Sequence, residues 1–244
     1  MTLSTARCLD AIATHSRGFA EAARDNLDSS VEHCPEWSVA DLVWHVTEVH
    51  WFWRTIAGER LDAPPDESRR PARAPDEELV DTFLAGAEAL VETLGAADQS
   101  APCWTWFPPQ QDVAFVTRHQ VQEAAVHHWD AAHAVGRDHV IDGNVAADSV
   151  EEFLTCSLAD ADDAEGSDVT LEGVLRLRAT DTGQTWTVSQ AGPDAALLWS
   201  AAPDHDAATI SGKVSDLLLW LYGRVDLPAD DAELVARFRS LSSR

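Results

Sequence analysis

The chain has 244 residues, 45% of them hydrophobic and ten of them tryptophan, which is enough for one large domain or two ordinary ones with packed cores. Its formal net charge is −25 at pH 7. Nucleic acids and anionic membranes require basic surfaces, so this charge argues against both as partners. The N-terminus has no apolar leader and no run approaches 18 apolar residues, which predicts a cytoplasmic protein without a membrane span.

The four cysteines are widely separated in the sequence and include no C-x-x-C pair. They are Cys8, Cys34, Cys103 and Cys156. This spacing favours neither a disulfide framework nor a cysteine-based zinc site. We therefore expect a reducing environment.

The first half of the chain predicts four helices of about 20 residues each. They are expected at residues 3–27, 38–57, 76–95 and 113–135. Ser38 and Asp41 have the spacing of a capping box at the start of the second helix. Gly95 and Gly136 are expected to end the third and fourth helices. Four such helices predict an antiparallel bundle, and bundle cores commonly hold metal sites.

The second half of the chain, after about residue 140, predicts a small α+β domain. Helices are expected at residues 145–160, 214–222 and 230–241, and strands at 169–179, 185–190, 196–201 and 208–210. Thr182-Gly183 marks a hairpin turn between the first two strands. The acidic stretch Asp160–Asp168 is expected to be a solvated loop. The predicted domains are therefore a helical bundle over residues 1–140 and an α+β domain over residues 141–244.

A carboxylate and two imidazoles are candidates for a metal site. Glu123 and His127 stand four residues apart in a stretch without Gly or Pro, which places them on one face of the fourth helix, one turn apart. His45 lies in the middle of the second helix. Three ligands from two helices leave coordination positions open, which is typical of a catalytic rather than a structural metal site.

Helical periodicity indicates which of these side chains point inward. At 100° per residue His45 falls on an apolar arc of the second helix, with His50 on its flank and Glu48 outside it. On the fourth helix Glu123 and His127 share a face with Val116, Asp130 and Ala134, while His128 points away. A carboxylate that faces a core requires a cation or a hydrogen-bond network, because an unpaired buried charge is costly.

The residues alone leave alternatives open. His45 can be a hydrogen-bonded core histidine, and Glu123 with His127 can be a simple ion pair within one helix. His119 and His50 are substitute ligands. Asp130 has the spacing either of a carboxylate that orients His127 or of a surface or capping residue. Two histidines and one carboxylate suit catalytic zinc and also non-haem iron.

Four segments spread over almost the whole chain form a recognisable combination. They are Cys34–His50, Trp104–Trp106, Arg118–Asp130 and Ile210–Arg224. In this order and spacing they resemble the mycothiol-dependent maleylpyruvate isomerase family, whose N-terminal part is a DinB-like four-helix bundle. The chain departs from the family pattern at Gln122, where histidine is frequent, and at Glu36, where glycine is common.

The resemblance implies roles for four residues. The zinc ligands of the family correspond to His45, Glu123 and His127, although iron or another divalent metal also suits them. A family arginine implicated in catalysis corresponds to Arg224. A guanidinium would pair bidentately with a carboxylate of a dicarboxylate substrate. The alternative for Arg224 is an arginine that interacts with the C-terminal dipole of the preceding helix.

The resemblance also implies a low-molecular-weight thiol, mycothiol or a similar one, as cosubstrate beside a small-molecule substrate. A metal-bound thiol is deprotonated and becomes a nucleophile at neutral pH. The expected reaction is a cis–trans isomerisation or an S-transfer. A ring of tryptophans is a candidate lining for the pocket, namely Trp44, Trp51, Trp53, Trp104 and Trp106.

Two other function classes are compatible with the same residues. One is a zinc-dependent hydrolase of amides or esters, for which Glu48 or His50 is the nearest candidate base. The other is a non-enzymatic protein that binds a metal or a small molecule. The expected oligomeric state is a monomer or a small homo-oligomer.

Overall fold

The structure is a computed structural model that describes residues 2–158, 169–192, 195–202 and 207–242. The chain divides into two compact units, Thr2–Ile141 and Asp142–Arg244. The predicted acidic loop Asp160–Asp168 lies wholly outside the described residues, and so do the last two positions of the helix predicted at 145–160. In the described part of the chain, no helix has the length and apolar character needed to cross a membrane.

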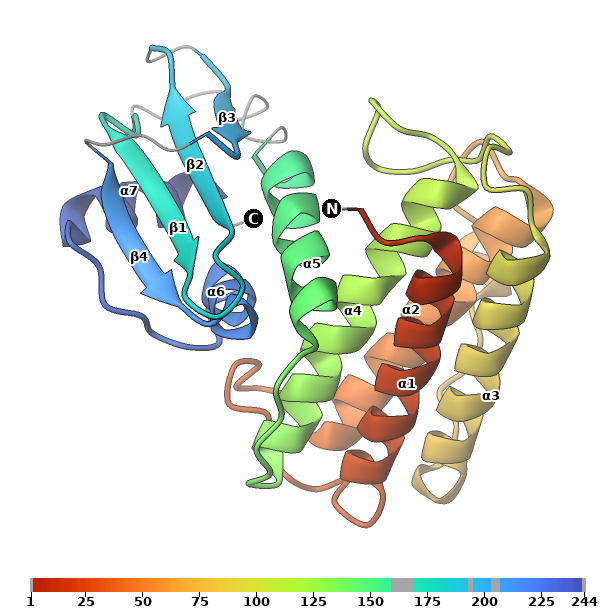
Figure 1. Cartoon of the computed structure of the whole chain (residues 1–244). Coiled ribbons are helices and arrows are strands. Elements are labelled where there is room, and N and C mark those ends of the chain that lie inside the picture. The colour runs from red at the N-terminus through yellow and green to blue at the C-terminus, as the bar shows by residue number, and fades with distance from the viewer. Residues whose placement is uncertain (1, 159–168, 193–194, 203–206, 243–244) are drawn as a thin grey trace. The chain divides into compact units, whose positions relative to one another are not determined.

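Four helices build the first unit (Figure 1): α1 (Thr5–Ala23), α2 (Val39–Glu59), α3 (Asp76–Ala96) and α4 (Val113–Ala134). A short 3-10 turn, Glu67–Arg69, precedes α3. Helices α1 and α2 each pack against both α3 and α4, so α1 and α2 are diagonal to one another. The predicted bundle is confirmed. Its largest fully buried side chains are Ile12, Phe19, Leu42, Ile56, Leu79, Phe83, Leu90 and Leu94.

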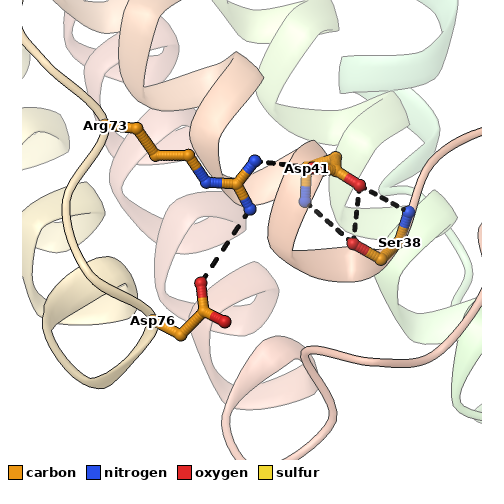
Figure 2. Close-up of polar contacts among 4 residues, drawn as sticks. All are labelled: Ser38, Asp41, Arg73 and Asp76. Atoms are coloured by element: carbon orange, nitrogen blue, oxygen red, sulfur yellow. Dashed lines mark hydrogen bonds and ion pairs between the residues drawn. The ribbon is translucent and has the colours of Figure 1, made fainter.

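The predicted capping box at the start of α2 is present (Figure 2). The Asp41 backbone NH donates to the Ser38 hydroxyl at 3.3 Å, and the Ser38 backbone NH donates to Oδ2 of Asp41 at 3.0 Å. Nη1 of Arg73 also donates to Oδ1 of Asp41, at 2.6 Å. These bonds satisfy helix donors that have no partner within the helix. They fix the start of the helix that carries His45.

We expect Asp41→Ala to destabilise the protein by about 0.5–1 kcal/mol, because it removes half of the capping box and an ion pair. Hydrogen bonds from Arg73 and Ser38 lower the pKa of Asp41 from 3.8 to about 2. A folded-state pKa below the unfolded value means that the stabilisation is complete above about pH 4 and is lost as the pH falls towards 2. Thermal unfolding of the variant and wild type should therefore differ at pH 7 and converge near pH 2.

Asp76→Ala is the matched control for that measurement. Asp76 approaches the same Arg73 guanidinium, but at 3.9 Å, and its side chain is 65% exposed (Figure 2). We expect a smaller change at pH 7 than for Asp41→Ala, because this ion pair is longer and more exposed. Equal effects of the two substitutions at pH 7 would contradict a capping role for Asp41.

Of the two glycines predicted to end helices, one does so and the other does not. Gly136 has a φ of 69°, and the backbone NH groups of Gly136 and Arg137 donate to the carbonyls of His133 and Ala132, so α4 ends as predicted. The prediction that Gly95 ends α3 is wrong, because the helix continues through Ala96.

Gly95 lies within α3 and does not have a positive φ. A Cβ at this position would be in ordinary contact with Cδ1 of Leu9 at 3.4 Å. The end of α3 is satisfied from outside the helix, because Nε2 of Gln99 donates to the carbonyl of Leu94 at 2.9 Å.

The second unit is the predicted α+β arrangement (Figure 1). Its elements are α5 (Gly143–Cys156), β1 (Val174–Ala179), β2 (Thr185–Gln190), β3 (Leu197–Ser200), β4 (Ala208–Gly212), α6 (Val214–Leu221) and α7 (Ala232–Ser242). The strand order is β3-β2-β1-β4, with β4 parallel to β1 and the other pairs antiparallel. Leu177 pairs with Trp186 and with Ile210, which forms a buried row across three strands.

The first strand of this unit is shorter than predicted. It begins at Val174 rather than at residue 169. Glu172 has a φ of 49°, and a Cβ on Gly173 would lie 3.0 Å from Leu234, so the chain bends here where α7 approaches. The predicted hairpin turn is present, because Gly183 has a φ of 75° between β1 and β2.

Candidate metal centre

His45, Glu123 and His127 lie together inside the bundle. His45 is in the middle of α2, and Glu123 and His127 occupy successive turns of α4. One potential ligand atom of each residue lies within 4.8 Å of those of the other two. Nε2 of His127 is 3.5 Å from Oε2 of Glu123, and the His45 and His127 ring centroids are 5.3 Å apart. The packing of α2 on α4 thus brings together the three residues selected from the sequence.

Asp130 orients His127. Oδ2 of Asp130 lies 3.0 Å from Nδ1 of His127, and the Asp130 side chain is 0% exposed. A carboxylate accepts the proton on Nδ1, so Nε2 of the neutral ring is left with its lone pair toward Glu123. Asp130 is therefore a buried partner of His127 and not a surface residue. Histidines that bind metals typically have such a carboxylate on the second ring nitrogen.

Oε2 of Glu123 is a buried atom whose nearest charged neighbour is Nε2 of His127 at 3.5 Å, a long ion pair without a well-formed hydrogen bond. Burial raises the pKa of Glu123, but contact with His127 and the charges of His119 and His45 outweigh it and lower that pKa to about 2. The carboxylate is thus ionised, and His127 is its closest cationic partner among the residues that these contacts describe. A divalent metal ion fits this position, because it would bind the oxygen and balance its charge.

The imidazoles of the group differ in their protonation. Burial lowers the pKa of His127, but the hydrogen bonds and charges of Asp130 and Glu123 raise it to about 9. Burial, and then the charge of His127, lower the pKa of His45. Without metal the site therefore holds a Glu123–His127 ion pair beside a neutral His45. A metal ion bound here would displace the proton from Nε2 of His127, since a ligating imidazole is neutral.

The two substitute ligands lie outside this group of three. Nε2 of His119 is 3.9 Å from Oε1 of Glu123, so His119 borders the site. His50, expected on the flank of the apolar arc of α2, is only 2% exposed and stacks on Phe83. Its burial follows from the packing of α3 on α2.

Glu48 and His50, the two residues considered as the base of a hydrolase, have other partners in the structure. Glu48 pairs with Arg70, with 3.0 Å between Oε1 and Nε. Burial lowers the pKa of His50 to about 4, which weakens the imidazole as a base at neutral pH. The charges of Glu123 and His127 also act on His50, so His50 is near the group but is a weak base.

Three of the five tryptophans are near the group, around His119. Trp53 stacks on Trp104 with centroids 6.1 Å apart, and its ring also contacts His119 edge to face. Trp106 contacts His119 with centroids 5.5 Å apart, and Phe115 stacks on the same imidazole. These aromatic side chains therefore border the His45–Glu123–His127 group on the side of His119.

Trp44 and Trp51 lie elsewhere. They line a separate pocket between α2 and α3, together with Thr47, Arg54 and Gly86. The tryptophans therefore do not form the single ring that was considered from the sequence. Trp44 and Trp51 are seven residues apart and share a face of α2. Trp53 is two residues beyond Trp51, so its side chain points to another face of the helix.

Arg224 belongs to the second unit, at the end of α6. The backbone NH groups of Arg224 and Gly223 donate to the carbonyls of Leu219 and Trp220, and Gly223 has a φ of 71°, which ends the helix. Nη1 of Arg224 donates to the carbonyl of Tyr222 at 2.8 Å. A contact of Arg224 with a helix terminus is thus present, while its catalytic role stays a prediction.

The structure also brings together two histidine groups that were not predicted. They are His15–His128–His139 and Glu32–His33–His133. His15 follows the buried positions Cys8 and Ile12 at helical spacing, which is a signal visible in the sequence. His139 lies after α4 in an irregular segment, so helical spacing could not predict that it packs against the bundle.

A helical bundle with a half-buried His–Glu–His group, followed by a four-stranded α+β unit, defines the class of protein. The model of the family described as mycothiol maleylpyruvate isomerase N-terminal domain matches residues 9–132, and that of the MDMPI C-terminal domain matches residues 144–236. The chain belongs to the mycothiol-dependent maleylpyruvate isomerase family, as its sequence segments had indicated.

Solved structures show the same fold. A crystal structure of the mycothiol-dependent maleylpyruvate isomerase is similar with a TM-score of 0.64 and 13% sequence identity, over 94% of this chain and 95% of that one. A histidine-to-alanine mutant of such an isomerase is similar over the same shares, with a TM-score of 0.63 and 12% identity. The comparison with curated proteins gives no match.

Proposed function

We propose that this protein is a zinc-dependent cytoplasmic enzyme that uses a low-molecular-weight thiol, mycothiol or a similar one, on a small electrophilic substrate. The observation that carries the proposal is the half-buried group of His45, Glu123 and His127, with an ionised carboxylate whose oxygen Oε2 has only a long contact to His127. Family membership supports the thiol chemistry. The reaction we propose is a cis–trans isomerisation, or the transfer of the thiol to an electrophile.

The three ligands we assign are His45, Glu123 and His127, in a metal-binding domain of residues 1–140 that precedes a separate α+β domain of residues 141–244. Bound zinc lowers the pKa of a thiol, so that the thiolate is available at neutral pH. Asp130 holds His127 in the tautomer that presents Nε2. Glu123 supplies the one negative charge among the ligands, and iron remains the alternative metal for this donor set.

The isomerisation requires no reactant besides the substrate and the thiolate, and the thiolate is regenerated. The thiolate sulfur forms a bond to one alkene carbon of a cis-enedione or enoate, and the electron pair of the double bond moves onto the conjugated carbonyl. Rotation about the resulting single bond follows. The electron pair then returns, the carbon–sulfur bond breaks, and the trans isomer and the same thiolate are released.

We assign Arg224 to a carboxylate of the substrate and expect Arg224→Lys to raise KM by about tenfold or more, because lysine keeps the charge but loses the bidentate fork. Steady-state kinetics with a carboxylate substrate and with its uncharged ester separate this role from a structural one, since only the acid should be affected. Arg178→Lys, on an exposed arginine of β1, is the control. Equal loss with acid and ester would contradict the assignment.

The proposal is tested by thiol dependence. The zinc-loaded protein is assayed with maleylpyruvate and with an electrophilic thiol acceptor, with and without mycothiol. We expect turnover only when both metal and thiol are present. Hydrolysis of esters or amides without thiol would replace the proposal with a hydrolase, and metal binding without any turnover would replace it with a binding protein.

A further inference from the structure

A second group of histidines lies on the opposite side of α4 from Glu123. His15 comes from α1, His128 from α4 and His139 from the segment that follows α4. One potential ligand nitrogen of each lies within 4.8 Å of those of the other two. Nδ1 of His15 and Nδ1 of His128 are 3.1 Å apart, and the His128 and His139 ring centroids are 3.8 Å apart.

The separation of the two Nδ1 atoms is close to what a metal ion requires. Zinc–nitrogen bonds of about 2.0–2.1 Å in tetrahedral geometry place two ligand nitrogens roughly 3.4 Å apart. His15 and His128 are within about 0.3 Å of this value at 3.1 Å. His139 is on an irregular segment, where a small shift of its ring involves no helix.

The bundle provides space for this arrangement through a glycine. Gly18 is three residues after His15 on α1, and a Cβ there would lie 2.3 Å from Cε1 of His128. The ring of His128 therefore occupies the place of a side chain on α1. Helices α1 and α4 hold His15 and His128 against each other by their close packing at this glycine.

Nδ1 of His15 and Nδ1 of His128 share a hydrogen bond, but one nitrogen of His139 has none with the described residues. Nε2 of His139 is buried, and no residue in the described part of the chain bonds to it. Burial also lowers the pKa of His139, so this imidazole is neutral at pH 7 and keeps a lone pair. A buried nitrogen without a hydrogen-bond partner indicates a missing binding partner. The three imidazoles would bind such a partner through nitrogen atoms alone.

We propose that His15, His128 and His139 form a second metal site, distinct from the His45–Glu123–His127 group, for a divalent transition-metal ion. The donor set is three nitrogens without a carboxylate, which suits zinc, copper(II) or nickel and does not suit magnesium or calcium. His127 and His128 are consecutive on α4 and would thus serve sites on different faces of one helix.

The test measures zinc binding by the full-length His127→Ala protein, in which the first site has lost a ligand. We expect this variant, stripped of metal and dialysed against zinc, to take up about one zinc per chain. Adding His139→Ala should weaken that binding by more than roughly tenfold, since loss of even an indirect partner of a metal ligand costs 10–100-fold. Adding Gly18→Ala should weaken it as well, by displacing the ring of His128.

Asp81→Asn is the control, because it removes an exposed carboxylate that belongs to none of the three groups and pairs with Arg24 on the surface. We expect the His127→Ala/Asp81→Asn protein to bind zinc as tightly as His127→Ala. Circular dichroism establishes that each variant is folded, and His139→Ala is the one least likely to disturb the bundle since His139 is outside the helices. No uptake by folded His127→Ala, or uptake that His139→Ala leaves unchanged, would overturn the second site without affecting the first.

Discussion

His127→Ala is expected to hold about one zinc ion per chain fewer than the wild-type protein and to lose thiol-dependent turnover. The substitution removes one of the three proposed ligands and leaves the Glu123 carboxylate without its partner at 3.5 Å. An unpaired buried carboxylate costs free energy, so the thermal midpoint of the variant should also fall. Elemental mass spectrometry of both proteins, purified in parallel without chelator, measures the difference in zinc content.

Glu123→Gln provides a second variant of nearly the same shape. It removes the negative charge of the ligand set, so we expect it too to bind one zinc ion fewer, with a smaller effect on folding. Asp81→Asn serves again as the control, because its carboxylate is exposed, pairs with Arg24 and belongs to none of the histidine groups. Equal zinc content in wild type and both site variants would show that the group is only an ion pair beside a core histidine.

Asp130→Asn is expected to weaken zinc binding by about 10–100-fold, although Asp130 is not one of the assigned ligands. The buried carboxylate accepts the Nδ1 proton of His127 at 3.0 Å and so presents Nε2 to the site. An amide at this position has no charge and can turn its NH2 group toward Nδ1, which would favour the wrong tautomer. Competition of the stripped protein with a chromogenic zinc chelator measures the affinity.

Asp81→Asn is the control for loss of a carboxylate as such. Asp81 pairs with Arg24 at 3.0 Å on the surface, and its side chain is 73% exposed. Its substitution should leave zinc affinity unchanged within twofold. Affinity that is unchanged in folded Asp130→Asn would mean that Asp130 does not position His127.

Local sequence patterns predicted the helices and the His45–Glu123–His127 group. The capping box of Ser38 and Asp41 and the glycine at Gly136 act within a few residues, so they are present in the structure as expected. Glu123 and His127 face the same way because the helical repeat alone decides this. The same repeat points His128 in another direction, as predicted.

Gly95 shows where local signals mislead. Glycine favours a helix end because it adopts positive φ easily, but Gly95 does not adopt it and the helix continues through Ala96. The side chain of Gln99, beyond the helix, instead satisfies the carbonyl of Leu94. The end of α3 was therefore misplaced, although by a single residue.

By itself the sequence determined the succession of helices and strands, the overall charge, the family and the pairing of Glu123 with His127 on one helical face. Only the tertiary structure decided what lies across from each face. It buried His50 against Phe83, made Asp130 the partner of His127, and brought His139 beside His128. These outcomes depend on which helices pack together and on the path of irregular segments, and neither follows from periodicity along a single element.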